Sequence, residues 1–314
     1  MTVELWVWVT FAALVVALFL FDLLVFARPG QEISFRRAVG WSVGWTVLGV
    51  AFGALLWAWQ GRAPAEEYLA GFLIEKSLSV DNLFVFALVF SYFAVPAPYQ
   101  RRVIFWGIVG AIVLRALFIL AGATLLDAFH AMIYVFGAFL VVTGIRMATH
   151  ADVEIHPERN PVVKLLARVL PLVPRYHGDR LVVRENGRLF ATPLAAAVAL
   201  VATFDVVFAV DSIPAIFAVT RETFLVYAAN AFSLLGLASL YFVLAGMIDR
   251  FRYLNVGLGV VLVFVGTKMA LADVYEIPVW ASLAAIVATL SVAVVVSLLG
   301  SAAAGRRVLT EGRS

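Results

Sequence analysis

Two apolar stretches of this sequence each hold a pair of acidic residues six positions apart. In both stretches a small polar residue follows the second acid, giving Glu75, Asp81 and Asn82 in the first and Asp205, Asp211 and Ser212 in the second. An ionisable side chain at membrane depth costs about 2.5–3.5 kcal/mol on insertion scales, so it is kept where it has a function. Four such carboxylates predict a site, and the ligand that suits them is a cation.

The ligand atoms and charges around these acids favour a hard divalent ion. Carboxylate, carboxamide and hydroxyl oxygens suit Mg²⁺, Ca²⁺ or Mn²⁺. Two basic residues at the same depth, Lys76 and Arg115, leave a net charge of minus two beside four ionised acids, which one divalent cation would neutralise. We hypothesise that Lys76 occupies the site when metal is absent. Arg115 fits a structural salt bridge or a gating role equally well.

The helical spacing places the two acids of each pair on different faces. Positions seven apart nearly eclipse on an ideal helix, whereas positions six apart are offset by about 120°. Glu75 therefore shares a face with Asn82, flanked by Ser79, while Asp81 lies on a neighbouring face. Either the helices border a broad polar cavity, or they unwind between the acids. Pro214 favours unwinding in the second stretch, because proline removes one helical hydrogen bond.

The composition indicates a polytopic membrane protein forming a single transmembrane domain over residues 1–314. The chain is 64% hydrophobic and 14% charged, with a mean hydropathy of +1.01, far from a soluble domain. It has no cysteine, which excludes disulfides, thiolate metal sites and cysteine nucleophiles. No Walker motif or nucleophile elbow is present, so we expect neither an enzyme nor a nucleotide-driven pump, and no permanently bound cofactor.

Hydrophobic windows of about 20 residues predict an all-α fold with about nine membrane-spanning helices. The first, Leu5–Phe26, has no basic n-region and is expected to be a retained span. The predicted helices are Leu5–Phe26, Ala38–Gln60, Glu67–Phe93, Val103–Leu126, Ala131–Met147, Pro193–Val219, Phe224–Ile248, Leu254–Leu271 and Pro278–Leu299.

The basic residues lie almost entirely in one set of loops, and the opposite set holds only Arg62 and Arg221. By the positive-inside rule, the N-terminus is outside and the C-terminus is in the cytoplasm of a bacterial inner membrane. This topology accounts for the basic pI, so we expect no nucleic-acid partner. Three charged residues near the ends of the spans, Asp22, Arg146 and Lys268, are expected to extend their charged groups to the interface.

The longest connection, residues 149–192, is predicted to be a cytoplasmic loop. Its first part, Asn160–Val173, is predicted to form an amphipathic helix at the anionic leaflet. Its second part, Leu181–Phe190, places an Asn-Gly turn between two apolar runs, which predicts a β-hairpin. A loop of this kind could also dock a protein partner.

Three sequence matches in the same order predict an internal repeat, residues 67–148 and 193–271. The acidic stretches match each other, Leu117–Gly122 matches Tyr241–Gly246, and Gly144–Ala148 matches Gly266–Ala270. Because the predicted topology runs the two copies in opposite directions, the repeat is inverted. Inverted repeats place substrate sites near the midplane, where the two copies meet.

The strings EKSLSVDNLFVF, ENGRLFATPL, FDVVFAVDSIPAIFAVT and LASLYF resemble the TerC family of bacterial integral membrane proteins, which includes the Alx proteins. The resemblance extends from about Leu69 to Ala270 and implies manganese exporters related to LysE-type transporters. It also implies that the metal ligands are Glu75, Asp81, Asn82, Asp205 and Asp211. One departure is Ala238, where the family usually carries an arginine. The residues expected to support the site are Lys76, Ser79, Arg115 and Ser212.

The leading prediction is therefore a secondary transporter in the lipid bilayer that exports Mn²⁺ or a similar hard divalent cation, with protons as the coupling partner. Carboxylates bind metal only when deprotonated, so protonation on the far side would release the ion. Two alternatives stay open. One is a membrane-embedded partner for the assembly or metalation of other proteins. The other is an exporter of organic cations.

Overall fold

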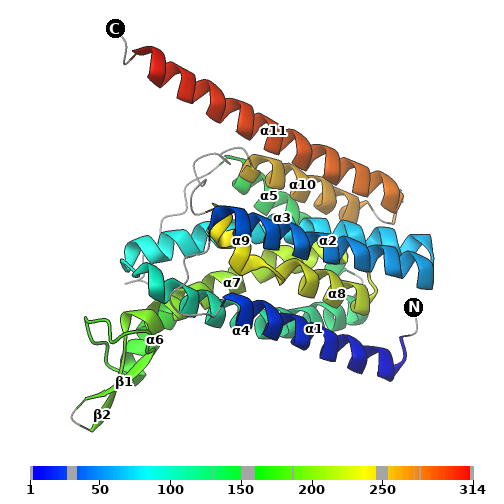
Figure 1. Ribbon diagram of the computed structural model, residues 1–314. Coiled ribbons are helices and arrows are strands. Elements are labelled where there is room, and N and C mark those ends of the chain that lie inside the picture. Colours follow the sequence, from blue (N-terminus) through cyan, green and yellow to red (C-terminus); the bar gives the residue numbers. More distant parts are fainter. Residues whose placement is uncertain are drawn as a thin grey trace.

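The structure is a computed structural model that describes residues 3–26, 34–129, 131–149, 160–185, 187–244, 254–271, 273–275 and 277–311. Within these ranges the chain forms eleven helices and one two-stranded sheet (Figure 1). The elements are α1 (Leu5–Phe26), α2 (Phe35–Gln60), α3 (Arg62–Tyr92), α4 (Ala97–Ala128), α5 (Met132–Thr149), α6 (Pro161–Val169), β1 (Val182–Glu185), β2 (Arg188–Ala191), α7 (Pro193–Phe217), α8 (Thr223–Leu234), α9 (Leu237–Leu244), α10 (Leu254–Ala270) and α11 (Val279–Glu311).

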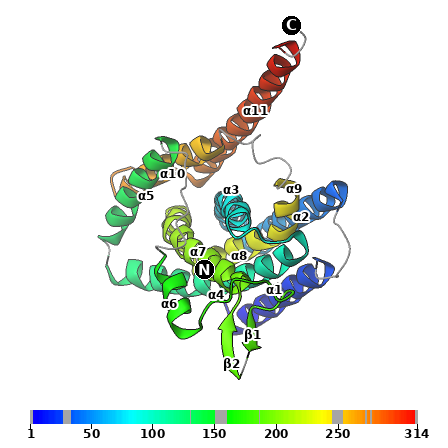
Figure 2. The same cartoon turned by 90° about the vertical axis from the view of Figure 1, so that its left-hand side faces the viewer.

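The long helices form a bundle around α3. Helix α3 packs against α2, α7 and α8, and α4 packs against α7. Viewed along the bundle, α3 lies at its centre, while α5, α10 and α11 form an outer group on one side (Figure 2). The helix that carries the first acidic pair is therefore enclosed by protein on most of its circumference.

The all-α, polytopic class is confirmed. Among the described residues, six helices are long and apolar enough to cross a membrane, or seven if the bent pair α8 and α9 is one span. Helix α10 has only 17 residues, and α3 carries Glu75, Lys76 and Asp81 near its middle. Each of the nine predicted segments overlaps a helix of the structure, but the count of nine membrane crossings stays a prediction.

The helices that carry the acidic pairs are continuous, so unwinding between the acids is wrong for both. Helix α3 runs unbroken from Arg62 to Tyr92, and α7 continues past Pro214 to Phe217. Pro214 lies inside α7 and removes one backbone hydrogen bond near its C-terminal end, but the helix continues past it. The break in this bundle lies instead between α8 and α9, which are bent by 41° relative to each other.

Helices α5 and α10 pack closely through two pairs of glycines. A Cβ atom built on Gly144 would lie 2.6 Å from the carbonyl oxygen of Gly259, and one on Gly259 would lie 2.6 Å from that of Gly144. Gly137 and Gly266 oppose each other in the same reciprocal way. Small residues allow such close approach in membranes. A two-fold axis that exchanges the two helices would produce this pattern, although the inverted repeat as a whole stays a prediction.

The surroundings of two glycines, Gly144 in α5 and Gly110 in α4, predict opposite effects on stability when each is replaced by alanine. Gly144→Ala should destabilise the protein by about 1–3 kcal/mol, because the new methyl group overlaps backbone that cannot move aside. Gly110→Ala in α4 meets nothing within 4 Å and should be neutral or stabilising by up to about 1 kcal/mol. Thermal unfolding of the two purified variants checks this. Equal losses of stability would show that the α5–α10 contact is looser than described.

The loop between α5 and α7 contains the predicted hairpin and the predicted helix. Strands β1 and β2 are antiparallel, with Val182 opposite Ala191, which confirms the hairpin. Helix α6 begins where predicted, because Asn160 caps it and accepts hydrogen bonds from the amides of Val162 and Val163. It ends at Val169 rather than Val173, because Pro171 disfavours a helical conformation at Leu170, which is extended. Residues 150–159 of the predicted loop lie outside the described part of the structure.

This loop is attached to the end of the bundle where α3 ends and α4 begins (Figure 1). The Tyr176 hydroxyl donates to the carbonyl of Phe93 at 2.5 Å, and Arg102 pairs with Asp179 at 2.6 Å. Burial raises the pKa of Tyr176, which keeps its hydroxyl protonated as a donor. The segment between α6 and β1 is therefore held against the bundle by side chains as well as by its connections.

Candidate functional site

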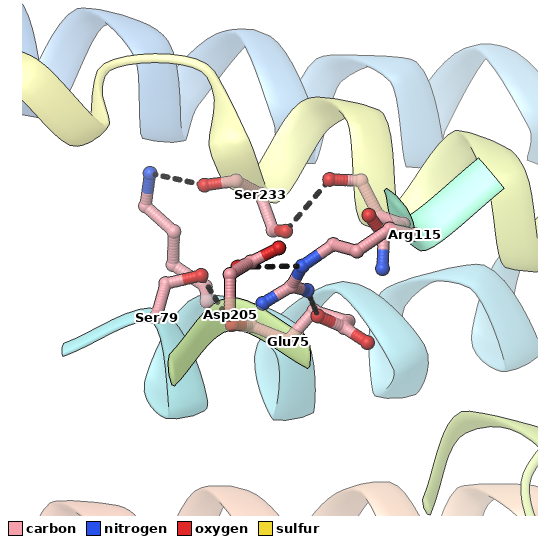
Figure 3. A network of polar contacts seen from close by, with 7 residues as sticks. Glu75, Ser79, Arg115, Asp205 and Ser233 are labelled. Atoms are coloured by element: carbon pink, nitrogen blue, oxygen red, sulfur yellow. Dashed lines mark hydrogen bonds and ion pairs between the residues drawn. The ribbon is translucent and has the colours of Figure 1, made fainter. Parts of the chain in front are cut away.

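One buried arginine joins the acidic residues of the two predicted repeats. Arg115 of α4 forms an ion pair with the Oε2 atom of Glu75 on α3. Its Nε atom lies 3.7 Å from the Oδ1 atom of Asp205 on α7. Arg115 is 1% exposed and Glu75 is 0% exposed. Figure 3 shows the guanidinium group between the two carboxylates. The structure thus brings together two predicted ligands and one predicted supporting residue.

The sequence of α4 explains how the arginine reaches this position. The buried face of α4 repeats every three or four residues and includes Gly107, Ala111, Arg115, Ile119 and Gly122. A Cβ atom on Gly107 would meet Phe86 of α3 and Val201 of α7 within about 3.0 Å. Gly107 and Ala111 let α4 approach both acidic helices, and Arg115, one turn after Ala111 on the same face, extends into the space between those helices.

Four oxygen atoms at the predicted site are buried without a hydrogen-bond partner. They belong to four predicted site residues and are Glu75 Oε1, Asn82 Oδ1, Asp205 Oδ2 and Ser212 Oγ. A buried polar atom that lacks a partner costs about 1–3 kcal/mol. Unsatisfied carboxylate, carboxamide and hydroxyl oxygens are also the donor set that binds hard cations. The oxygens of these four residues are therefore suitable ligands for a divalent cation.

Asn82 and Asp205 line one narrow pocket together. The other walls come from apolar and small residues of α3, α4, α7 and α9, among them Phe86, Gly107 and Leu237. Phe86 follows Asn82 on α3 and Gly107 precedes Arg115 on α4, so both lie toward the end of the bundle where α3 ends and α4 begins. The pocket has a volume of about 10 Å³, which is room for about one water molecule, and it lies directly against Asn82 and Asp205.

The remaining predicted ligands are only partly placed. Asp81 lies on α3 and Asp211 on α7, but their side chains are outside the described part of the structure. Ser79 is fully buried and donates to the carbonyl of Glu75 at 2.7 Å, so it braces α3 rather than offering its hydrogen to a ligand. In the described residues, no three His, Cys, Asp or Glu side chains gather as a metal centre.

Lys76 does not take the position expected for it. Its ammonium group donates to the carbonyls of Ser233 and Leu235, at 3.1 and 3.0 Å, at the break between α8 and α9. Consecutive residues on a helix are rotated by about 100°, so Lys76 and Glu75 face different neighbours. The internal counter-ion of the acids in this structure is Arg115, and the expectation that Lys76 fills that place is wrong here.

Asp22 also differs from expectation. It was expected to reach the interface, yet it is 1% exposed. Its carboxylate faces the Gly236 amide, the Trp45 indole nitrogen and Lys76. Trp45 of α2 and Gly236 of the α8–α9 break lie beside this end of α1, which sequence alone does not reveal. The sequence feature that could have indicated a buried Asp22 is that it is the single acidic residue inside the apolar run Leu5–Phe26.

Comparison with known proteins decides the family. The model of the integral membrane protein TerC family matches residues 60–305. The chain belongs to the TerC family. The TerC match covers both acidic stretches, α4 with Arg115 and the α8–α9 break.

Similar TerC-type proteins align with almost the whole chain. An uncharacterised membrane protein of Myxococcus xanthus is 47% identical over 294 residues, covering 94% of this chain and 92% of that protein. A putative membrane-bound redox modulator Alx of Salmonella typhi is 44% identical, covering 92% and 93%. The protein of that name from Escherichia coli K12 is 45% identical, covering 88% and 89%. No solved structure matches.

Proposed function

We propose that this TerC-family protein is a secondary transporter that exports Mn²⁺, or a similar hard divalent cation, across the bacterial cytoplasmic membrane. The observation that carries the proposal is the set of buried, unpartnered oxygens on α3 and α7 around Arg115. Glu75, Asn82 and Asp205 would supply ligands. Asp81 and Asp211, by their positions on the same helices, would complete the set.

Arg115 gives the site a way to exchange its ligand. Two carboxylates beside one guanidinium carry a net charge of minus one in the described cluster. A divalent cation that enters must replace the arginine as the partner of these acids. When the ion leaves, the arginine returns and prevents two buried negative charges from facing each other uncompensated. This competition favours release as well as binding, which a transporter requires.

The pocket beside Asn82 and Asp205 supports loading from the cytoplasm. Its lining residues Phe86 and Gly107 lie toward the end of the bundle that carries the basic loop, and the positive-inside rule assigns that end to the cytoplasmic side. The outer ends of α3 and α7 would open in the opposite state of an alternating-access cycle. Protons are the proposed coupling ion, because protonation of the carboxylates competes with metal binding.

Flux measurements on the reconstituted protein test the proposal. Vesicles containing the purified chain are loaded in parallel with Mn²⁺, Mg²⁺, Ca²⁺ or a basic amino acid, and one set receives a pH gradient alone. We expect flux of Mn²⁺ that exceeds flux of the amino acid and that a pH gradient accelerates. Flux of the amino acid alone would favour the organic-cation alternative, and no flux of any solute would contradict transport.

A second candidate function is supported by the apolar surface of the loop. Leu165 and Val169 of α6 and Leu189 of β2 are exposed, at 59%, 70% and 54%. Such side chains could dock a protein that this chain helps to assemble or metalate. The Alx relatives are named as putative redox modulators. This chain has no cysteine with which to carry out thiol–disulfide chemistry itself.

Deleting the hairpin, residues 181–190, separates the two candidates. The Glu75, Arg115 and Asp205 cluster does not contact the hairpin, so a transporter should retain Mn²⁺ flux in vesicles after the deletion. A docking protein should lose its effect in cells while flux persists. Loss of flux in vesicles, with the protein still folded, would show that the loop belongs to the transport machinery.

A further inference from the structure

The break between α8 and α9 exposes backbone carbonyls inside the bundle. Leu235 and Gly236 separate the helices, and Gly236 has a φ of 75°, in the left-handed region. A Cβ atom at Gly236 would lie 2.5 Å from the Trp45 ring, so only glycine fits. The last carbonyls of a helix have no amide partner and carry the negative end of its dipole. They therefore attract a cation.

Lys76 supplies that cation from within the chain. Its ammonium group is bound by the carbonyl oxygens of Ser233 and Leu235, at 3.1 and 3.0 Å. Ser233 is itself fully buried, with its hydroxyl donating to the carbonyl of Asn230. An ammonium group held by backbone carbonyls makes the contacts that such carbonyls make with a free alkali cation.

Asp22 supplies the negative charge of the same site. It is 1% exposed, and neither of its carboxylate oxygens has a hydrogen-bond partner among the described residues. The groups that face it are the Trp45 indole from α2, the Gly236 amide from the break and Lys76 from α3. Lys76 and Asp22 cancel in charge, so removing the lysine would leave a buried anion next to two unsatisfied carbonyls.

We propose that the α8–α9 break is a monovalent-cation site that Lys76 fills in place of a free ion. The ligands are the carbonyls of Ser233 and Leu235, and the buried carboxylate of Asp22 balances the charge of the bound cation. This site is separate from the cluster of Glu75, Arg115 and Asp205, and it stands on its own contacts whether or not the chain carries Mn²⁺. With Lys76 present the break is fixed without sodium or potassium. Without it, Na⁺ or K⁺ binds there.

Thermal unfolding of the purified protein tests this in NaCl, KCl or choline chloride at equal ionic strength. The wild type should unfold at the same temperature in all three salts. Lys76→Met should unfold at a lower temperature than the wild type in choline chloride. In NaCl or KCl its unfolding temperature should rise by about 5 °C when the cation is at about a hundredfold excess over its dissociation constant, and the rise should saturate with cation concentration. The matched control is Lys268→Met in α10, another partly buried lysine, which should show no cation response.

A charge-neutral variant covers the case in which Lys76→Met folds poorly. Lys76→Met combined with Asp22→Asn removes both charges, so it should fold in choline and show no response to Na⁺ or K⁺. The proposal is overturned if folded Lys76→Met unfolds at one temperature in all three salts. It is also overturned if the unfolding temperature of the double variant rises in NaCl or KCl. A third contradicting result is that Lys76→Met fails to fold in every salt while the double variant folds. Mn²⁺ flux enters none of these outcomes, so they are independent of the proposed export function.

Discussion

Replacing Arg115 with methionine should destabilise the metal-free protein by about 3–5 kcal/mol. The substitution removes the positive partner of Glu75 and Asp205 and leaves two buried carboxylates close together without compensation, which is the costly way to break a buried ion pair. The same variant should gain stability on addition of Mn²⁺, and by more than the wild type, because the ion no longer competes with a guanidinium group.

Thermal unfolding with and without Mn²⁺ measures both parts of this prediction. Arg102→Met is the matched control, since Arg102 lies on the same helix but pairs with Asp179 at the surface. An exposed pair contributes about 0–1 kcal/mol, so the control should unfold near the wild-type temperature. If Arg115→Met unfolds like Arg102→Met, or does not respond to Mn²⁺, then Arg115 is not the counter-ion of a metal site.

Asp205→Asn should lower the affinity for Mn²⁺ by at least about 100-fold, and Glu75→Gln should do the same. Both substitutions keep the size of the side chain and remove one negative charge. Two unit charges 4 Å apart interact by about 4 kcal/mol at an effective dielectric constant of 20, and each 1.4 kcal/mol is tenfold in affinity. Titration of the purified variants with Mn²⁺ gives the affinities directly.

The control for these variants is Asp127→Asn, which removes an exposed carboxylate near the end of α4. It should bind Mn²⁺ as the wild type does. Equal affinities for Asp205→Asn and Asp127→Asn would mean that the buried oxygens on α3 and α7 serve packing alone.

Local features of the chain were predictable from sequence. Runs of about 20 apolar residues determine where helices form in a membrane, because every backbone group must be satisfied within the segment. The Asn-Gly pair between two apolar runs predicted the hairpin of β1 and β2 from equally local information. The acids on α3 and α7 were identifiable because a charge in an apolar run is costly wherever the helix packs.

The partners of those charges were not predictable. Which acid Arg115 meets depends on how closely α4 approaches α3 and α7, and this depends on Gly107 and its neighbours in three dimensions. Glu75 and Lys76 are adjacent in sequence, yet one faces Arg115 and the other the α8–α9 break. Their spacing in the sequence gives the angle between the two side chains around the helix axis, but it does not show which neighbouring helices each side chain meets.

The break itself had only a weak signal in the sequence. Gly236 is one glycine inside an apolar run, and such a glycine is tolerated within a helix. Its left-handed conformation results from tertiary contacts, with Trp45 against it and Lys76 on the carbonyls before it. For the same reason Asp22 was expected at the interface, although helices remote in sequence bury it.

Export of Mn²⁺ through the acids of α3 and α7 is tested most directly by flux from vesicles that contain wild-type protein, Asp205→Asn or Asp127→Asn in equal amounts. The predicted result is rapid Mn²⁺ flux with the wild type and Asp127→Asn, and flux at the level of protein-free vesicles with Asp205→Asn. Equal flux in all three, or none with the folded wild type, would contradict the proposed function.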